Sequence, residues 1–427
     1  MRLIEFCGSV FFIVLLGSQG LAATLHVPSE YATIQDAVEA AASGDEILLA
    51  PGRYAGDGNT YIEVDGLSLS IRSESGPDVT TIDGEDSRWG LRFRTDAVDM
   101  VSIHGIEFTG LGGAVGSAIL VQGSGEAIVE DCRFVRCTTP DYDPYGNGSG
   151  VVMVKDEVRS SFRRCEFSWN DAPFSPSGLR VASSGESTVE MCDFIANSTG
   201  AMDIEASSTA ASLADCNFVN NGGALYALGG SVRISDCSFI NNGSGILSRS
   251  QLTITGSTFA RTRGILVVSG TLYAENTILN DGCPSVDLQA NAPVTLVCCA
   301  VDSSFVSGWE HITLEGEQVW DDPLFCDPEV CGGFNDGGID RYRLHADSPC
   351  VWWRSPCGVR IGSLDVGCGA AGIGACCIGD ECVLAPEDAC ASAGGIFVGE
   401  GTTCEPSPCG AVPVVPMSWG TIKELFR

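Results

Sequence analysis

The residues best placed to do chemistry in this chain are charged side chains at the centre of a recurring Cys-x-Phe unit and its relatives. The middle residue of each unit is expected to face outward, where successive units place Glu107, Arg133, Glu166 and Asp193. If the units stack as neighbouring strands, Glu166 and Asp193 lie about 5 Å apart, the carboxylate separation of retaining glycosidases. The alternative, which we favour, is a surface ladder of charges whose ion pairs each contribute little.

A second outward-facing column follows the glycines of the units and includes Arg180, Asp203 and Tyr226. We treat these side chains as candidate ligand contacts, because Tyr226 and Tyr273 from a neighbouring strand could stack on sugar rings. Scattered exposed apolar side chains are normal on protein surfaces, so this column predicts binding less specifically than the first.

Few residues point to a metal or a cofactor. Two acidic, glycine-rich segments at residues 140–150 and 333–342 offer oxygen ligands that suit Ca²⁺, although neither matches an EF-hand loop. We therefore expect no cofactor and no metal centre, and Ca²⁺ is the one candidate ion. The histidines, which lack the spacing of metal ligands, are His26, His104, His311 and His345.

The elements that position these residues form a repeat. Three short strand signals recur in each unit: the Cys-x-Phe pair, a segment after a glycine, and a segment before the next Cys. A slip of the period-two pattern between Ile234 and Cys237 indicates a bend. Since no unit can bury its own apolar face, the repeat predicts a parallel β-solenoid with three strands per coil. Leucine-rich repeats compete with this interpretation, but the units lack their leucine spacing and helix-forming half.

The repeated cysteines are predicted to pack inward as small hydrophobic side chains. Parallel, in-register side chains point the same way, which is poor geometry for a disulfide. A Cys132–Cys137 bridge or an occasional bridge between coils is the alternative. An asparagine three residues after each Phe is predicted to form an inward ladder of amide hydrogen bonds. The cysteines are Cys132, Cys165, Cys192, Cys216 and Cys237, and the asparagines are Asn170, Asn197, Asn221 and Asn242.

The two ends of the chain differ from the repeat. Thr33 and Asp36 approximate a capping box for a helix that presents Ile34, Ala37 and Val38, together with Ala41, on one face. Six cysteines in a short segment predict a disulfide-stapled module, with zinc binding as the alternative: Cys376, Cys377, Cys382, Cys390, Cys404 and Cys409. The predicted organisation is a signal peptide (1–23), a cap helix (24–46), a parallel β-helix (47–320), a terminal coil and cap (321–370), the Cys-rich module (371–410), and a linker and tail (411–427).

The opening "VPSEYATIQDAVEAAASGDEILLAPGRYAGDGN", together with the repeats, resembles secreted right-handed parallel β-helix proteins of the pectin-lyase-like superfamily. The resemblance covers roughly residues 26–368. It implies an all-β, right-handed parallel β-helix whose open apolar end is capped by the leading helix, with an asparagine ladder at a turn. In related lyases and hydrolases the active site lies on an outer face of the coil. The "RSPCGVR" segment is similar to an arginine element of pectate lyases, but its second arginine, Arg360, arrives one residue late.

The net charge limits the class of partner, and the apolar segments of the sequence indicate where the protein acts. With 55 acidic and 23 basic residues, the chain has a net charge of −32, which disfavours nucleic acid and anionic polymers. No later apolar run is long enough to span a membrane, so we expect a secreted or surface-associated protein. We expect a non-catalytic binding or structural role, with an extracellular polysaccharide or cell-surface glycan as partner. The alternative is a polysaccharide lyase or glycoside hydrolase, and the oligomeric state stays open.

Overall fold

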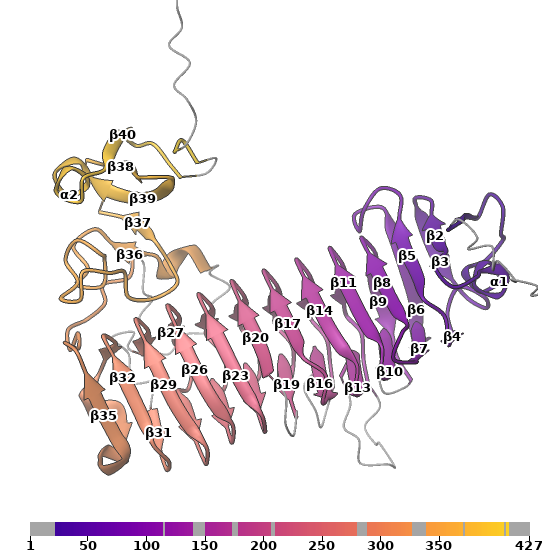
Figure 1. Ribbon diagram of the computed structural model, residues 1–427, viewed down its shortest axis with the longest axis horizontal. Helices are drawn as coiled ribbons and strands as arrows, with labels where there is room; N and C mark the ends of the chain where they lie inside the picture. Colours follow the sequence, from indigo (N-terminus) through magenta and orange to yellow (C-terminus); the bar gives the residue numbers. More distant parts are fainter. Residues whose placement is uncertain are drawn as a thin grey trace, which may run out of the picture.

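Three parallel sheets run along the length of the molecule. A computed structural model describes residues 22–113, 116–139, 150–172, 178–205, 210–279, 288–326, 339–369, 372–404 and 407–409. The chain visits the three sheets in turn, so that each coil adds one strand to each sheet (Figure 1). Equivalent strands of successive coils pair in parallel and in register. The predicted parallel β-helix with three strands per coil is confirmed.

Neighbouring strands within each sheet come from successive coils. Sheet 1 contains β1 (Thr24–Val27), β2 (Glu46–Leu49), β5 (Leu69–Ser73), β8 (Met100–His104), β11 (Glu126–Glu130), β14 (Arg159–Arg163), β17 (Ser187–Glu190), β20 (Ala210–Ala214), β23 (Ser231–Ser235), β26 (Gln251–Thr255), β29 (Thr271–Glu275), β32 (Val294–Val297) and β35 (Ile312–Glu315). Sheet 2 contains β3 (Gly52–Ala55), β6 (Thr80–Arg88), β9 (Glu107–Leu111), β12 (Arg133–Val135), β15 (Glu166–Ser168), β18 (Asp193–Ile195), β21 (Asn217–Val219), β24 (Ser238–Ile240), β27 (Thr258–Ala260), β30 (Ile278–Leu279) and β33 (Ala300–Val301). Sheet 3 contains β4 (Ile62–Asp65), β7 (Leu91–Thr95), β10 (Ile119–Gly123), β13 (Val152–Asp156), β16 (Leu179–Ser183), β19 (Met202–Ile204), β22 (Leu225–Ala227), β25 (Ile246–Ser248), β28 (Ile265–Val267), β31 (Leu288–Ala290) and β34 (Val306–Ser307).

A stack of phenylalanine rings fills the coil behind sheet 2. Neighbouring ring centroids in this stack are 4.4 to 5.1 Å apart and the rings are nearly parallel, because equivalent residues of successive coils repeat at the strand spacing. None of the rings is exposed, so each adds a large buried apolar surface to the core. The rings belong to Phe108, Phe134, Phe167, Phe194, Phe218, Phe239 and Phe259.

One left-handed residue makes each bend from sheet 1 into sheet 2. In the coil of Cys237, Asp236 has a φ of 51°, and its equivalents Asp131, Arg164 and Met191 have φ values of 52 to 53°. A single left-handed residue turns the strand and resets which side chains face inward. This explains the predicted slip between Ile234 and Cys237. The bend also turns the side chains of its left-handed residues toward the edge of the outer face of sheet 2, where the candidate site lies.

The cysteine column lies inside the coil, directly after these bends. All five predicted cysteines are at most 2% exposed, and all have free thiols. The thiols donate to backbone carbonyls, as Cys216 Sγ does to Val189 O at 3.4 Å. Cys132 and Cys137 are both buried and free, so the alternative bridge between them does not form. Burial raises the pKa of the Cys132 thiol to about 12, which makes it a poor nucleophile.

The asparagines form a continuous hydrogen-bonded ladder at the bend after sheet 2. Asn170, Asn197 and Asn221 each donate from the backbone N–H and from the side-chain amide to the Oδ1 of the next member. The last member, Asn242, donates to Thr262 Oγ1 at 3.2 and 3.3 Å. Each amide also donates to a carbonyl of the preceding coil, so the ladder satisfies polar groups that the bend would otherwise leave buried without partners.

The helix α1 (Ile34–Ala40) closes the N-terminal end of the coil (Figure 1). Its first turn carries the predicted capping box, since Thr33 Oγ1 accepts from Asp36 N and the Asp36 carboxylate accepts from Thr33 N. Ile34, Ala37 and Val38 are buried against the first coils. Ala41 also packs against this core as expected, although its backbone is extended and it lies just beyond the last helical turn.

The segment that follows the coil folds back over the outer face of sheet 2. It contains the 3₁₀ turn Ile339–Tyr342 and the short strands β36 (Leu344–His345) and β37 (Val366–Cys368). We call residues 339–369 the cap. Apolar side chains of the cap form a second hydrophobic cluster with outward-facing residues of the last coils, among them Ile240 and Ala260. Ser238, which the sequence places on an open outer face, is only 1% exposed because Ser363 of the cap lies 2.8 Å from its hydroxyl.

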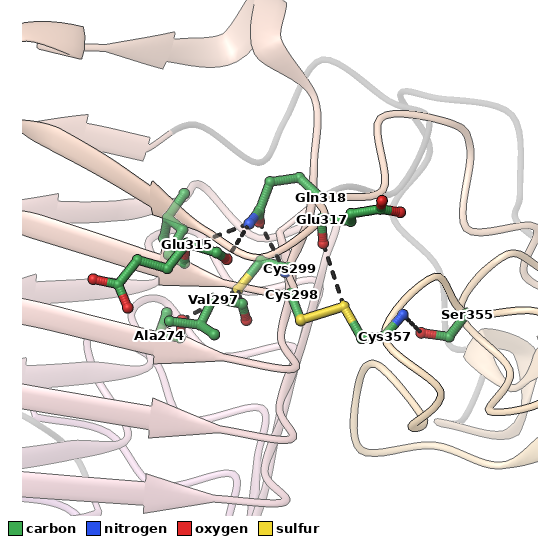
Figure 2. The surroundings of a disulfide bond; sticks show 10 residues. Ala274, Val297, Cys298, Cys299, Glu315, Glu317, Gln318, Ser355 and Cys357 are labelled. Atoms are coloured by element: carbon green, nitrogen blue, oxygen red, sulfur yellow. Dashed lines mark hydrogen bonds between the residues drawn. A yellow bond between two sulfur atoms is a disulfide. The ribbon is translucent and has the colours of Figure 1, made fainter.

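A disulfide ties the cap to the coil. Figure 2 shows Cys298, at a bend of the last coils, bonded to Cys357 of the cap. A second disulfide, Cys326–Cys368, joins the end of the coil to β37. These two disulfides were not predicted from the sequence. They fix the cap over the last coils and leave the outer face of the earlier coils outside its cover.

The Cys-rich module follows the cap as a small antiparallel sheet with one helix. Its elements are β38 (Ile373–Ile378), β39 (Glu381–Pro386), α2 (Glu387–Ser392) and β40 (Ile396–Glu400). All six predicted cysteines form disulfides, which confirms the stapled module and leaves none of these thiols free to bind zinc: Cys376–Cys390, Cys377–Cys409 and Cys382–Cys404. In the part of the chain that the structure describes, no helix has the length and apolar character needed to cross a membrane.

Candidate functional site

The structure brings the four predicted charged residues together on the outer face of sheet 2. Arg133 pairs in register with Glu107 on one side and with Glu166 on the other, and Glu166 pairs with Asp193. Arg133 Nε lies 3.8 Å from Glu166 Oε2, and both side chains are 37% exposed. The column is therefore an ordered array of carboxylates and one guanidinium that solvent can reach.

A cleft of about 360 Å³ lies beside this array. We call it the β15 cleft, and it joins the outer face of sheet 2 to the neighbouring bend. Asp131, Arg164 and Met191 enter it from that bend. The full lining is Pro77, Asp78, Asp131, Arg133, Arg164, Cys165, Glu166, Met191 and Asp193.

Fixed partners hold the charged groups of the cleft. Arg133 donates to Asp78 at 2.6 Å in addition to its contact with Glu166. Arg164 donates two hydrogen bonds to Asp131, at 2.6 and 2.7 Å. These bonds orient both guanidiniums, because a planar fork that meets a carboxylate has few alternative positions.

The carboxyl groups of the array and of the neighbouring bend differ in pKa. Burial raises the pKa of Asp193, and the hydrogen bond that Asn217 Nδ2 donates at 2.8 Å opposes this rise. Burial also raises the pKa of Glu107, against the attraction of Arg133. The hydrogen bonds from Arg164 lower the pKa of Asp131. The site thus combines one firmly ionised carboxylate, Asp131 at the bend, with two carboxyl groups of the array that ionise less readily than usual.

One group of residues beside the cleft has the side chains of a metal site. His104, Glu130 and Asp131 have ligand atoms within 4.8 Å of one another. Arg164, however, lies 2.6 Å from Asp131 and 3.7 Å from Glu130, and His104 Nε2 lies 2.8 Å from Asp131. A guanidinium in this position already neutralises the carboxylates and repels a metal cation. Of the two segments predicted to suit Ca²⁺, residues 140–149 and 333–338 lie outside the described residues.

The second predicted column does not form an open binding face. Arg180 and Asp203 are buried, with side chains 9% and 5% exposed, and they form an ion pair at 3.3 Å that includes Glu205. Burial raises the pKa of Asp203 to about 7. Tyr226 is partly buried in sheet 3, whereas Tyr273 belongs to sheet 1, so the expected stacking pair is wrong. The two-residue period of a strand predicts which side chains face outward. It does not predict which of these side chains the rest of the chain buries.

The residues that complete the β15 cleft were not predicted from the sequence. Asp131, Arg164 and Met191 each precede a repeated cysteine by one position, which is a signal that the repeat contained. The position before each cysteine can be recognised as part of a site only once the structure shows that the bend turns its side chain toward the outer edge of sheet 2. Asp78 comes from the loop between β5 and β6 and has no equivalent in the repeat.

A family model agrees with this architecture. Residues 89–259 and 149–318 match the family model described as the right handed beta helix region. No significant match is found among curated protein sequences. Of the solved structures, a mutant of the PL6 family alginate lyase AlyGC is similar, with 14% identity and a TM-score of 0.47, over 80% of this chain and 57% of that one. A mannuronic acid specific polysaccharide family 6 lyase from human gut microbiota has 13% identity and a TM-score of 0.39, over 69% of this chain and 83% of that one.

Proposed function

The chain belongs to the right-handed β-helix family, and from this premise we propose that it is an exported, non-catalytic protein that binds a neutral glycan in the β15 cleft. The observation that carries the proposal is the ordered array of side chains in that cleft. With the neighbouring bend, the cleft presents guanidinium, carboxylate and thioether groups on a rigid sheet, and no residue of the cap lines it. Oriented polar groups on a rigid scaffold suit the fixed hydroxyl pattern of a sugar ring.

A binding role agrees better with the hydrogen bonds of the array than a catalytic role does. A catalytic carboxyl acts as a general acid or base, or as a nucleophile, and in each case one of its oxygens must be free to meet the substrate. Glu166 Oε1 already accepts from Ser168 Oγ at 2.6 Å, and Asp193 Oδ1 accepts from Asn217 at 2.8 Å. These bonds keep the oxygens oriented as acceptors for ligand hydroxyl groups.

The charge of the cleft favours a neutral ligand. Four carboxyl groups, from Asp78, Asp131, Glu166 and Asp193, face two guanidiniums, from Arg133 and Arg164. The whole chain carries a net charge of −32. An anionic polymer would be repelled both by the cleft and by the surrounding protein.

Export agrees with the disulfides. The described residues contain five disulfide bonds, two on the cap and three in the module, and such bonds persist in oxidising compartments. The apolar leader at residues 1–23 has the composition of a secretory signal.

Calorimetric titration with neutral and uronic-acid oligosaccharides tests the proposal. We expect a neutral oligosaccharide to bind without release of reducing or unsaturated ends. Arg133→Ala should weaken binding by about tenfold, the effect of losing one charge-assisted hydrogen bond. Arg159→Ala is the matched control, because Arg159 is exposed on sheet 1 and pairs there with Glu126. Equal dissociation constants for the two variants would refute binding in the cleft.

A polysaccharide lyase or glycoside hydrolase is the second candidate. It is favoured by the register of Glu166 and Asp193 on neighbouring strands and by the raised pKa of Asp193, which suits a general acid. In this case the wild-type protein releases new ends from a polysaccharide, and Glu166→Gln and Asp193→Asn each abolish the release while Arg159→Ala does not. That result would replace the non-catalytic proposal.

A further inference from the structure

A second cavity lies far from the β15 cleft, between the cap and the Cys-rich module. Its volume is about 440 Å³, within the range of small-ligand sites. From the cap it is lined by Trp352, Trp353 and Arg354, and from the module by residues of β39 and α2. The module residues are Pro386, Asp388, Ala389, Ser392 and Ala393.

The two tryptophans form a rigid corner. Their ring centroids are 5.6 Å apart and the ring planes meet at 89°. Both rings pack against the disulfide-stapled core of the module, which includes Cys376 and Cys390. A ligand in the cavity would meet preformed aromatic surfaces, and little side-chain entropy would be lost on binding.

The polar groups of the cavity lie at its rim. An ion pair with Asp347 at 2.6 Å orients the guanidinium of Arg354. Ser392 Oγ donates to Asp388 O at 2.8 Å, which leaves its lone pairs able to accept. Asp388 and Ser392 are exposed, so the Asp388 carboxylate and the Ser392 hydroxyl can form hydrogen bonds with a ligand.

An adjoining cavity extends this surface along the module. Its volume is about 540 Å³, and it shares Pro386 and Asp388 with the first cavity. Phe397 and Glu400 add a further aromatic ring and carboxylate. The two cavities adjoin at these shared residues, and we call the pair the module groove.

We propose that the module groove is a second saccharide-binding site, in which the Trp352–Trp353 corner contacts the apolar face of a sugar ring while Arg354, Asp388 and Ser392 bind its hydroxyl groups. An extended peptide fits these walls less well. Peptide recognition along a strand uses backbone N–H and C=O groups, whereas Pro386 is the only residue of a strand that lines the first cavity, where the tryptophans lie, and proline has no N–H. The site binds its ligand independently of the β15 cleft.

Tryptophan fluorescence and calorimetry of the full chain test this proposal, with cellohexaose, laminarihexaose and mannohexaose as probes and casein peptides as the competing class. We expect at least one hexaose to change the emission of the wild-type protein and of the Trp169→Phe variant. Trp169 does not line the β15 cleft, but it is the exposed tryptophan nearest to the cleft residues in sequence, so this variant removes its contribution to the emission. Trp353→Ala and Asp388→Ala should each weaken the same hexaose on the order of tenfold. Asp388→Ala changes an exposed side chain, so it tests the site even if Trp353→Ala fails to fold.

The outcomes separate this site from the β15 cleft. If Arg133→Ala has no effect while Trp353→Ala and Asp388→Ala weaken binding, the module groove is a saccharide site and the cleft is not. If folded Trp353→Ala and Asp388→Ala bind every hexaose like the wild type, the proposal is wrong, whatever the result for Arg133→Ala. A response to casein peptides alone, or to none of the probes, also overturns it.

Discussion

The asparagine ladder makes the sharpest prediction for the fold, and Asn221 is its central member. The Asn221 side chain accepts from Asn197 N and Asn197 Nδ2, at 3.0 and 2.9 Å, and donates to Phe194 O at 2.9 Å. In Asn221→Ala the buried Asn197 N–H and Phe194 carbonyl lose these partners. Each such group costs about 1 to 3 kcal/mol, so we expect the free energy of unfolding to fall by about 2 to 6 kcal/mol.

A matched variant separates the ladder from a general effect of losing asparagine. Asn217 lies four residues earlier on the same coil, but its side chain faces outward and bonds Asp193. We expect Asn217→Ala to cost less than about 1 kcal/mol, as surface substitutions usually do. The assay is equilibrium urea denaturation followed by circular dichroism.

A second variant tests the hydrogen bonds directly. At the end of the ladder Thr262 Oγ1 accepts from Asn242 N and Nδ2 and donates to Phe239 O. Asn221→Thr should therefore recover a large part of the loss, because a hydroxyl can accept from Asn197 and donate to Phe194 O in the same manner. Equal losses for Asn221→Ala and Asn217→Ala, or no recovery by threonine, would refute the argument.

Three further predictions concern the disulfides, the buried acid and the thiols. Replacing both Cys298 and Cys357 by serine opens a loop with a sequence separation of 59 residues, which costs about 4 kcal/mol in the chain-entropy model; limited proteolysis should then cut residues 339–369 first, and an unchanged cleavage pattern would contradict this role. The pKa of Asp203 is about 7 in the folded protein and about 3.9 unfolded, so the folded state binds more protons and stability falls as pH rises from about 4 to about 7. Asp203→Asn should flatten that slope in thermal melts, and an unchanged slope would disprove it. Thiol titration should find the Cys132 column unreactive in the native state and free after denaturation without reductant, and a column that yields no thiols would show bridges instead. Because the folded pKa of Cys132 is raised to about 12 from about 8.5, its contribution to stability is complete below about pH 8.5 and is lost as pH rises toward 12.

The sequence alone determined the coil. Cys216 and Cys237 occupy equivalent positions in neighbouring coils, and the backbone N–H of Cys216 lies 3.4 Å from the Cys237 thiol. Such contacts join equivalent residues of neighbouring coils, so every repeat unit needs the same residue types at the same positions. This requirement is visible in the sequence as a period. The asparagine ladder, the bend near Asp236 and the outward array at Glu166 follow from that period for the same reason.

Only the tertiary structure decided which parts of the outer surface stay open. Ser238 and Ser363 are 125 residues apart in sequence, and their hydroxyl groups form a single contact that is not part of the repeat. The repeat therefore does not predict that the cap covers this coil. Arg180 and Asp203 leave the coil as their spacing predicts, yet the rest of the chain buries them. The groove at Trp353 arises in the same way, because it combines residues of the cap and of the module, whose relative position depends on packing. The β15 cleft owes most of its lining to the repeat, but Asp78 enters it from a loop that has no equivalent in other coils. Packing between such elements leaves no periodic pattern in the sequence.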